Sequence, residues 1–117
     1  QKYDGTFEQY KFHLNIQHNK KLSISTEHRL NKKLYRSEFD ESQIPLLTQQ
    51  ICDTCEQLLE LLQDLIDNGG QMIEGKNEKT LQITEHNDKL EINIKIILYI
   101  GRTARNFQTT LNLNQIK

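Results

Sequence analysis

The apolar residues of this chain change their spacing twice, and that change constrains the fold more than any other feature of the sequence. From Tyr10 to Phe39 they alternate with polar residues, which is the period of a strand with one buried face. From Ile44 to Leu65 they recur every three or four residues, as one stripe of a helix does. After Lys79 the alternation returns. The order therefore predicts strands, then a helical segment, then strands again.

The boundaries of these elements follow from polar turns and from caps. A β-hairpin is predicted over residues 7–29, a third strand over 34–39 and further strands over 80–116. The helical segment covers 42–67, and Asp53 followed by Glu56 would form a second capping box, so that it divides near Cys52. Ile97 and Tyr99 make one late strand apolar on both faces, which predicts a central place in the sheet. The predicted fold is α+β, mainly β: a small antiparallel β-sandwich with a helix or helix-turn-helix inserted between strands 3 and 4.

Composition narrows the class of protein. The chain has 117 residues, which predicts a single globular domain over 1–117, and its formal net charge is −1. A nearly neutral domain has no overall field to attract nucleic acid or an anionic membrane, so we expect neither as a partner. No apolar run reaches the roughly 20 residues of a membrane span, and no signal peptide opens the chain. With only two cysteines, a cytosolic, reduced protein is expected.

No residues in the sequence form a recognisable catalytic or metal-binding motif. Cys52 and Cys55 form a lone C-x-x-C, but zinc would need two further ligands, and the four histidines are scattered. A thioredoxin-like redox pair would need a βαβ unit, which the predicted order lacks. We therefore interpret both cysteines as core residues, with a small redox protein as the alternative. The acids Glu38, Asp40 and Glu41 stand at a helix start, where they favour the helix dipole. No enzyme activity and no cofactor are predicted.

Charge is unevenly distributed along the chain. Between Lys11 and Arg36 there are seven Lys and Arg residues and one acid, whereas 51–70 holds five acids and no base. A candidate surface for an acidic partner, such as tubulin tails or nucleic-acid phosphates, consists of Lys20, Lys21, Arg29, Lys32, Lys33 and Arg36. The alternative is a solvated strand edge guarded by lysines.

A run of residues from the third strand into the helix resembles a known family. The segments are Glu27–Leu30 (EHRL), Tyr35–Ser42 (YRSEFDES), Ile44 and Leu47–Thr48, in register without a gap. They resemble the head domain of the basal-body coiled-coil proteins related to the algal variable-flagella-number product. Thr84–Asn87 and Ile94–Leu98 also resemble the centriolar cartwheel protein, and both kinds are similar to the X-ray-repair type of DNA end-joining scaffold.

The resemblance implies a non-enzymatic, self-associating scaffold of centrioles or basal bodies, in the cytoplasm and cytoskeleton. In such proteins a β-sandwich head precedes a long parallel coiled coil, which would begin after Lys117. Heads pair through an exposed apolar residue near a β-hairpin tip, and coils pair separately, so that rings or filaments form. The matching tip here is Asn87–Leu90: Lys89 stands where the cartwheel pattern has an aromatic residue, and Leu90 is the candidate contact, with the start of a strand as its alternative role.

The implied partners are further copies of the chain and, through the basic residues, tubulin or other centriolar proteins. The alternative function is the head domain of a DNA end-joining scaffold, which would place the protein in the nucleus.

Overall fold

The computed structural model describes all of residues 1–117 and contains eight strands and three helical segments. The elements are β1 (Lys2–Phe7), β2 (Tyr10–Ile16), β3 (Leu22–His28), β4 (Leu34–Phe39), the 3-10 helix η1 (Glu41–Gln43), α1 (Ile44–Leu47), α2 (Cys55–Asp67), β5 (Gln71–Glu74), β6 (Asn77–His86), β7 (Lys89–Ile100) and β8 (Thr103–Ile116). The α+β, mainly β class predicted from the spacing of apolar residues is confirmed.

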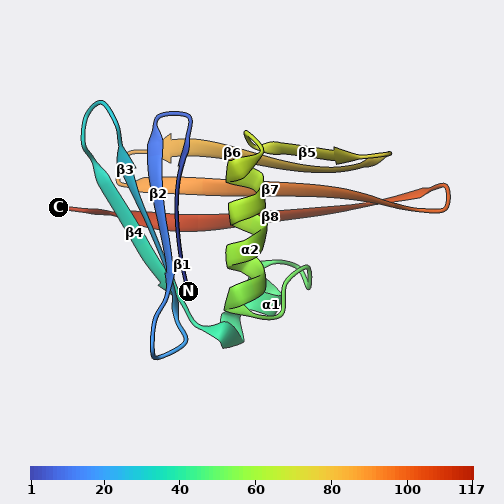
Figure 1. The fold of residues 1–117 in the computed structure, drawn as a ribbon, viewed down its shortest axis with the longest axis horizontal. Coiled ribbons are helices and arrows are strands. Elements are labelled where there is room, and N and C mark those ends of the chain that lie inside the picture. The colour runs from blue at the N-terminus through green and yellow to red at the C-terminus, as the bar shows by residue number, and fades with distance from the viewer.

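All eight strands belong to one antiparallel sheet, in the order β1-β2-β3-β4-β8-β7-β6-β5. The sheet curls at the contact between β4 and β8, which joins only Leu34–Arg36 to Asn114–Ile116. We call β1–β4 the N-terminal half-sheet and β5–β8 the C-terminal half-sheet (Figure 1). The two predicted layers are therefore two halves of a single sheet.

Two strands were not predicted, and both lie at an end of the sheet. In β1 only Phe7 is buried, and in β5 no residue is, so neither strand shows a clear alternation. Because β1 precedes the predicted hairpin, the helices lie between β4 and β5 instead of between strands 3 and 4. The central place predicted for the strand with Ile97 and Tyr99 is confirmed, since β7 pairs with β6 and β8.

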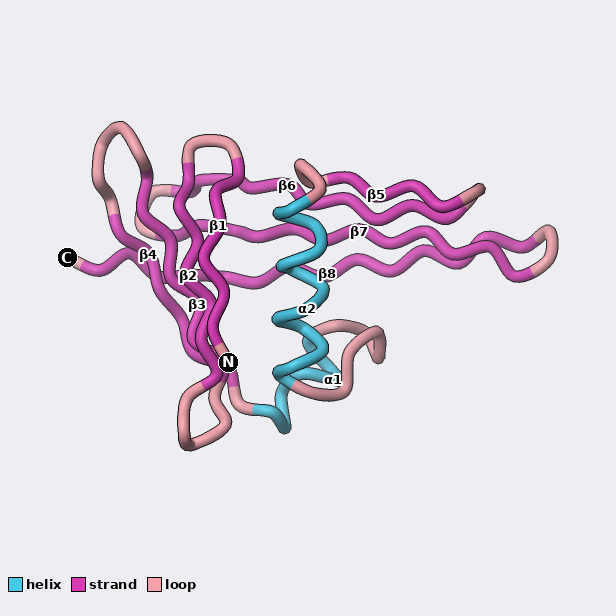
Figure 2. Tube along the Cα trace, viewed as in Figure 1, coloured by secondary structure: helices cyan, strands magenta, loops and turns pink.

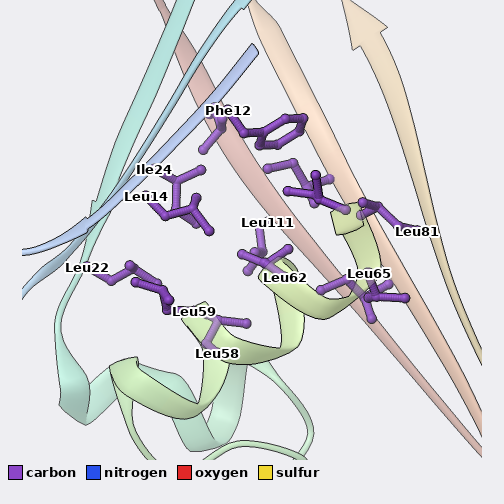
Figure 3. Packing of buried hydrophobic residues seen from close by; sticks show 14 of the residues in the cluster. Phe12, Leu14, Leu22, Ile24, Leu58, Leu59, Leu62, Leu65, Leu81 and Leu111 are labelled. Carbon is purple, nitrogen blue, oxygen red and sulfur yellow. The ribbon is translucent and has the colours of Figure 1, made fainter. Parts of the chain in front are cut away.

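Helix α2 crosses the sheet and supplies the middle of the core (Figure 1). Its leucines meet apolar side chains from both half-sheets, as Figure 3 shows. The fully buried or nearly buried residues labelled there are Phe12, Leu14, Leu22 and Ile24 from the N-terminal half, Leu58, Leu59, Leu62 and Leu65 from α2, and Leu81 and Leu111 from the C-terminal half. The stripe predicted from the three-to-four spacing is the buried face of α2.

The helical segment divides as expected, although with a different cap. Thr54, not Asp53, is the N-cap of α2: its hydroxyl accepts from the Gln57 backbone N–H at 3.1 Å. The Gln57 side chain in turn accepts from the backbone N–H of Asp53, the residue before the N-cap, at 2.6 Å, so the cap lies one residue later than predicted and differs from the full capping box. At the other end the Tyr3 hydroxyl donates to Asp67 at 2.5 Å and fixes α2 against the edge strand β1.

Replacing either of two buried threonines with valine is expected to change stability, but in opposite directions. Thr26 lies in the core of the N-terminal half-sheet with no hydrogen-bond partner for its hydroxyl. The Thr48 hydroxyl lies 2.7 Å from the Ile44 carbonyl oxygen and accepts from the Cys52 backbone N–H at 3.0 Å. We expect Thr26→Val to raise the free energy of unfolding by about 1 kcal/mol and Thr48→Val to lower it by about 1–3 kcal/mol, measured by urea denaturation. A loss in both variants would mean that the Thr26 hydroxyl has a partner.

Candidate interaction surface

The turn between β6 and β7 does not expose the apolar residue expected there. Asn87 and Lys89 are exposed, and Asn87 has a positive φ of 46° in the two-residue turn. Leu90, however, is fully buried, between Glu85 on β6 and Leu113 on β8. Leu90 and Ile92 are two residues apart on β7, so their side chains lie on the same face of the sheet, which is the face toward the core. The prediction of Leu90 as the contact between heads is therefore wrong, and its alternative role at the start of a strand is the observed one.

The turn between β7 and β8 does carry exposed apolar residues. It closes at Gly101, whose φ of +64° suits glycine, and it projects beyond α2 (Figure 1). Ile100 is 65% exposed and Tyr99 is 40% exposed. Ile100 faces the same side of the sheet as Ile96 but lies past the end of the covered region. Ile100 therefore continues the alternation of β7 without being buried.

The length of β7 accounts for this exposure. A strand of 12 residues is about 40 Å long, whereas a helix that crosses it covers about 10–12 Å. The remainder of β7 is covered by the N-terminal half-sheet at one end only (Figure 2). The free end of the C-terminal half-sheet, with the β5–β6 and β7–β8 turns, is called the distal end below.

A groove lies between α2 and the C-terminal half-sheet, next to the distal end. Its volume is about 390 Å³, and its apolar lining is Ile51, Cys52, Leu61, Ile96 and Leu98. The polar lining consists of Gln57, Glu60, Asp64 and Lys79. The carboxylates of Glu60 and Asp64 therefore border an apolar floor. Leu98, which belongs to this floor, lies two residues before Ile100 on β7.

The six basic residues of the candidate acidic-partner surface are not together. Lys20 and Lys21 lie at the β2–β3 turn, and Arg29, Lys32 and Lys33 lie at the β3–β4 turn. These turns are at opposite ends of β3 (Figure 2), a strand of 7 residues that is roughly 23 Å long. Arg36 lies between them on β4, so no single basic surface forms.

Three of these six cations also have acidic neighbours. Lys21 lies 3.7 Å from Asp40, Lys32 lies 4.0 Å from Glu27, and Arg36 lies 3.8 Å from Glu38. Such exposed pairs contribute little to stability, but they partly neutralise the charge. The six residues predicted as one candidate surface for an acidic partner are therefore spread over the N-terminal half-sheet, and three of them are partly neutralised.

The two cysteines are separate core residues. Cys52 lines the groove described above, and Cys55 begins α2 with its sulfur 3.7 Å from the Phe39 carbonyl oxygen. Both are unpaired and buried, and burial raises the pKa of each thiol, which disfavours the reactive thiolate. Asp40 is the N-cap of η1, as the helix-start interpretation of the acids indicated.

The structure offers neither a membrane-spanning helix nor a metal-binding cluster. None of its helices combines the length and the apolar character that crossing a membrane requires. No three His, Cys, Asp or Glu side chains are grouped so that they could hold a metal ion.

The fold is thus a curled antiparallel sheet with helices inserted after β4 and a long final hairpin. No protein-family model matches the sequence, and no curated protein matches it either. Among solved structures, the chain is similar to the head domain of human CCDC61, with a TM-score of 0.62 over 99% of both chains. The two sequences are 16% identical, so this similarity shows a CCDC61-like fold.

Proposed function

We propose that this chain is the head domain of a non-enzymatic, self-associating scaffold of centrioles or basal bodies, located in the cytoskeleton of the cytoplasm. The observation that carries the proposal is the fold shared with the CCDC61 head domain over 99% of both chains. The residues from Glu27 to Thr48 that resemble the basal-body family support it independently of the fold. In the proposed protein a coiled coil follows Lys117, and its sequence would show a sustained seven-residue apolar repeat.

Self-association is proposed to use the distal end of the C-terminal half-sheet. Ile100 is the exposed apolar residue near a hairpin tip that the resemblance calls for, a role that buried Leu90 cannot fill. Its receptor on the second copy is the groove between α2 and β7. Arg102 and Arg105 follow Ile100, and Glu60 and Asp64 border the groove, so the charges of the two surfaces are complementary.

The positions of these two surfaces favour a reciprocal contact. Ile100 and the Leu98 side of the groove are on the same strand, so a two-fold axis can place each tip on the groove of the other copy. One small apolar residue on each side provides a limited contact area. We therefore expect a dissociation constant on the order of 10 μM to 1 mM for isolated heads.

Sedimentation velocity over a range of concentrations tests the contact. Wild-type chain should form dimers at high concentration, and Ile100→Glu should remain monomeric, because it places a carboxylate against Glu60 and Asp64. Leu46→Glu is the matched control: Leu46 is 85% exposed on α1, so the same change at a surface leucine should leave dimerisation intact. Monomeric wild type at about 1 mM, or dimers of Ile100→Glu as strong as those of wild type, would contradict the proposed contact.

A further inference from the structure

Strand β8 has a backbone edge that the rest of the chain leaves open near the distal end. It pairs with β7 from Thr103 to Asn114, but with β4 only from Asn114 to Ile116. Edge backbone groups are a ready template for an additional strand. The open segment therefore lies between the β7–β8 turn and the region where β4 begins to pair.

The hydrogen bonds show which residues face this edge. Ile100 and Thr103 pair across the two-residue turn, so alternate residues from Thr103 bond to β7 and the others face outward. Consistent with this, the Gln108 backbone N–H donates to the Gln49 side chain at 3.0 Å, and the Asn112 carbonyl accepts from the Ser37 hydroxyl at 2.8 Å. The backbone N–H and C=O groups of Ala104 and Asn106 face outward like those of Gln108 and Asn112, yet no protein group bonds to them.

The charged residues on the part of the β7–β8 hairpin next to this edge are all cationic. After Glu91 the chain contains no acid, while Lys95, Arg102 and Arg105 lie on the β7–β8 hairpin. None of these three cations takes part in an ion pair. Two such edges brought together would place arginines near arginines, which disfavours a second copy as the occupant.

We propose that the edge of β8 at Ala104 and Asn106 binds an extended acidic segment of a partner protein as an added β-strand. The segment would pair with the outward N–H and C=O groups, and its carboxylates would meet Arg102 and Arg105. A nucleic-acid backbone fits less well, because its phosphates would face the outward carbonyl oxygens, which need donors. This surface shares Arg102 and Arg105 with the contact proposed for self-association, but the strand pairing at Ala104 and Asn106 requires neither Ile100 nor the groove.

The test uses the whole chain and a short capped peptide of alternating valine and glutamate, with a valine–lysine peptide for comparison. Backbone amide NMR should show binding of the glutamate peptide alone, with slowed hydrogen exchange at Ala104 and Asn106. Asn106→Pro removes an outward N–H without removing a bond to β7, and it should weaken binding at least about tenfold. Asn106→Ala, which keeps that N–H, should bind as wild type does.

A second variant keeps the proposal testable if proline disturbs the hairpin. Replacing Arg102 and Arg105 together with glutamate should abolish binding of the glutamate peptide and create binding of the lysine peptide. Equal binding by Asn106→Pro and wild type would overturn the proposal, because attraction between charges would then suffice without strand pairing. Absence of binding to the glutamate peptide, or protection at another edge of the sheet, would overturn it as well.

Discussion

Leu90→Glu is expected to unfold the domain. Leu90 is fully buried between β6 and β8, so the change removes a core leucine, a loss of about 2–5 kcal/mol. It also buries a carboxyl group with no arranged partner, which adds several kcal/mol whether the group ionises or stays protonated. The sum is comparable to the whole stability of a domain, about 5–15 kcal/mol. Circular dichroism and a thermal melt of the purified chain measure the result.

Lys89→Glu is the matched control, since it changes the neighbouring exposed residue of the same hairpin. We expect its free energy of unfolding to stay within about 0.5 kcal/mol of wild type. A folded Leu90→Glu chain that melts like wild type but has lost dimerisation would show that Leu90 is an exposed contact after all. The comparison thus separates Leu90 from Ile100, where the same substitution should abolish dimerisation and leave the fold intact.

Local periodicity was sufficient to predict most of the core. Leu90, Ile92, Ile94 and Ile96 alternate in sequence and are all buried, because the period of a strand determines which side chains share a face. The pattern could not show where coverage ends along that face. Ile100 continues the alternation but lies beyond α2, and coverage depends on how a distant helix crosses the sheet.

The alternation of apolar residues could not predict the edge strands. β1 and β5 lie at the two ends of the sheet and bury one residue or none, so their sequences need no apolar alternation. A neighbour on one side only is enough for them to form. The predicted order of strands, helical segment and strands therefore gave the right class of fold, but it missed β1 and β5 and so numbered the strand before the helices as the third instead of the fourth.

The candidate site was predicted only in part. The resemblance implied an exposed apolar residue near a hairpin tip; Ile100 beside the β7–β8 turn is one such residue, whereas Leu90 in the segment Asn87–Leu90 is buried. The basic residues could have been separated from sequence alone. Consecutive turns of an antiparallel meander lie at opposite ends of the strands, so Lys20 and Lys33 belong to different surfaces.

The end of α2 gives the second large effect, for Gly70→Ala. Gly70 has a φ of +88°, and its N–H donates to the Leu65 carbonyl at 2.7 Å while its carbonyl accepts from the Leu81 N–H at 2.8 Å. A Cβ there would meet the ring of Phe7, with Cζ 2.7 Å away, and would lie 3.3 Å from the Leu81 carbonyl oxygen. Backbone strain of about 1–2 kcal/mol and overpacking of about 1–3 kcal/mol add to a loss of roughly 2–5 kcal/mol.

Gly69→Ala separates these two contributions, because Gly69 has a φ of +72° but no atom within 4 Å of an added Cβ. It should cost only the backbone strain, about 1–2 kcal/mol in urea denaturation. The excess loss at Gly70 should shrink when Phe7→Leu is combined with Gly70→Ala, since the ring that the methyl group meets is then absent. Equal losses at both glycines, or strict additivity with Phe7→Leu, would show that Phe7 does not pack over Gly70, and the junction that connects α2 to β1 and β6 would need a different account.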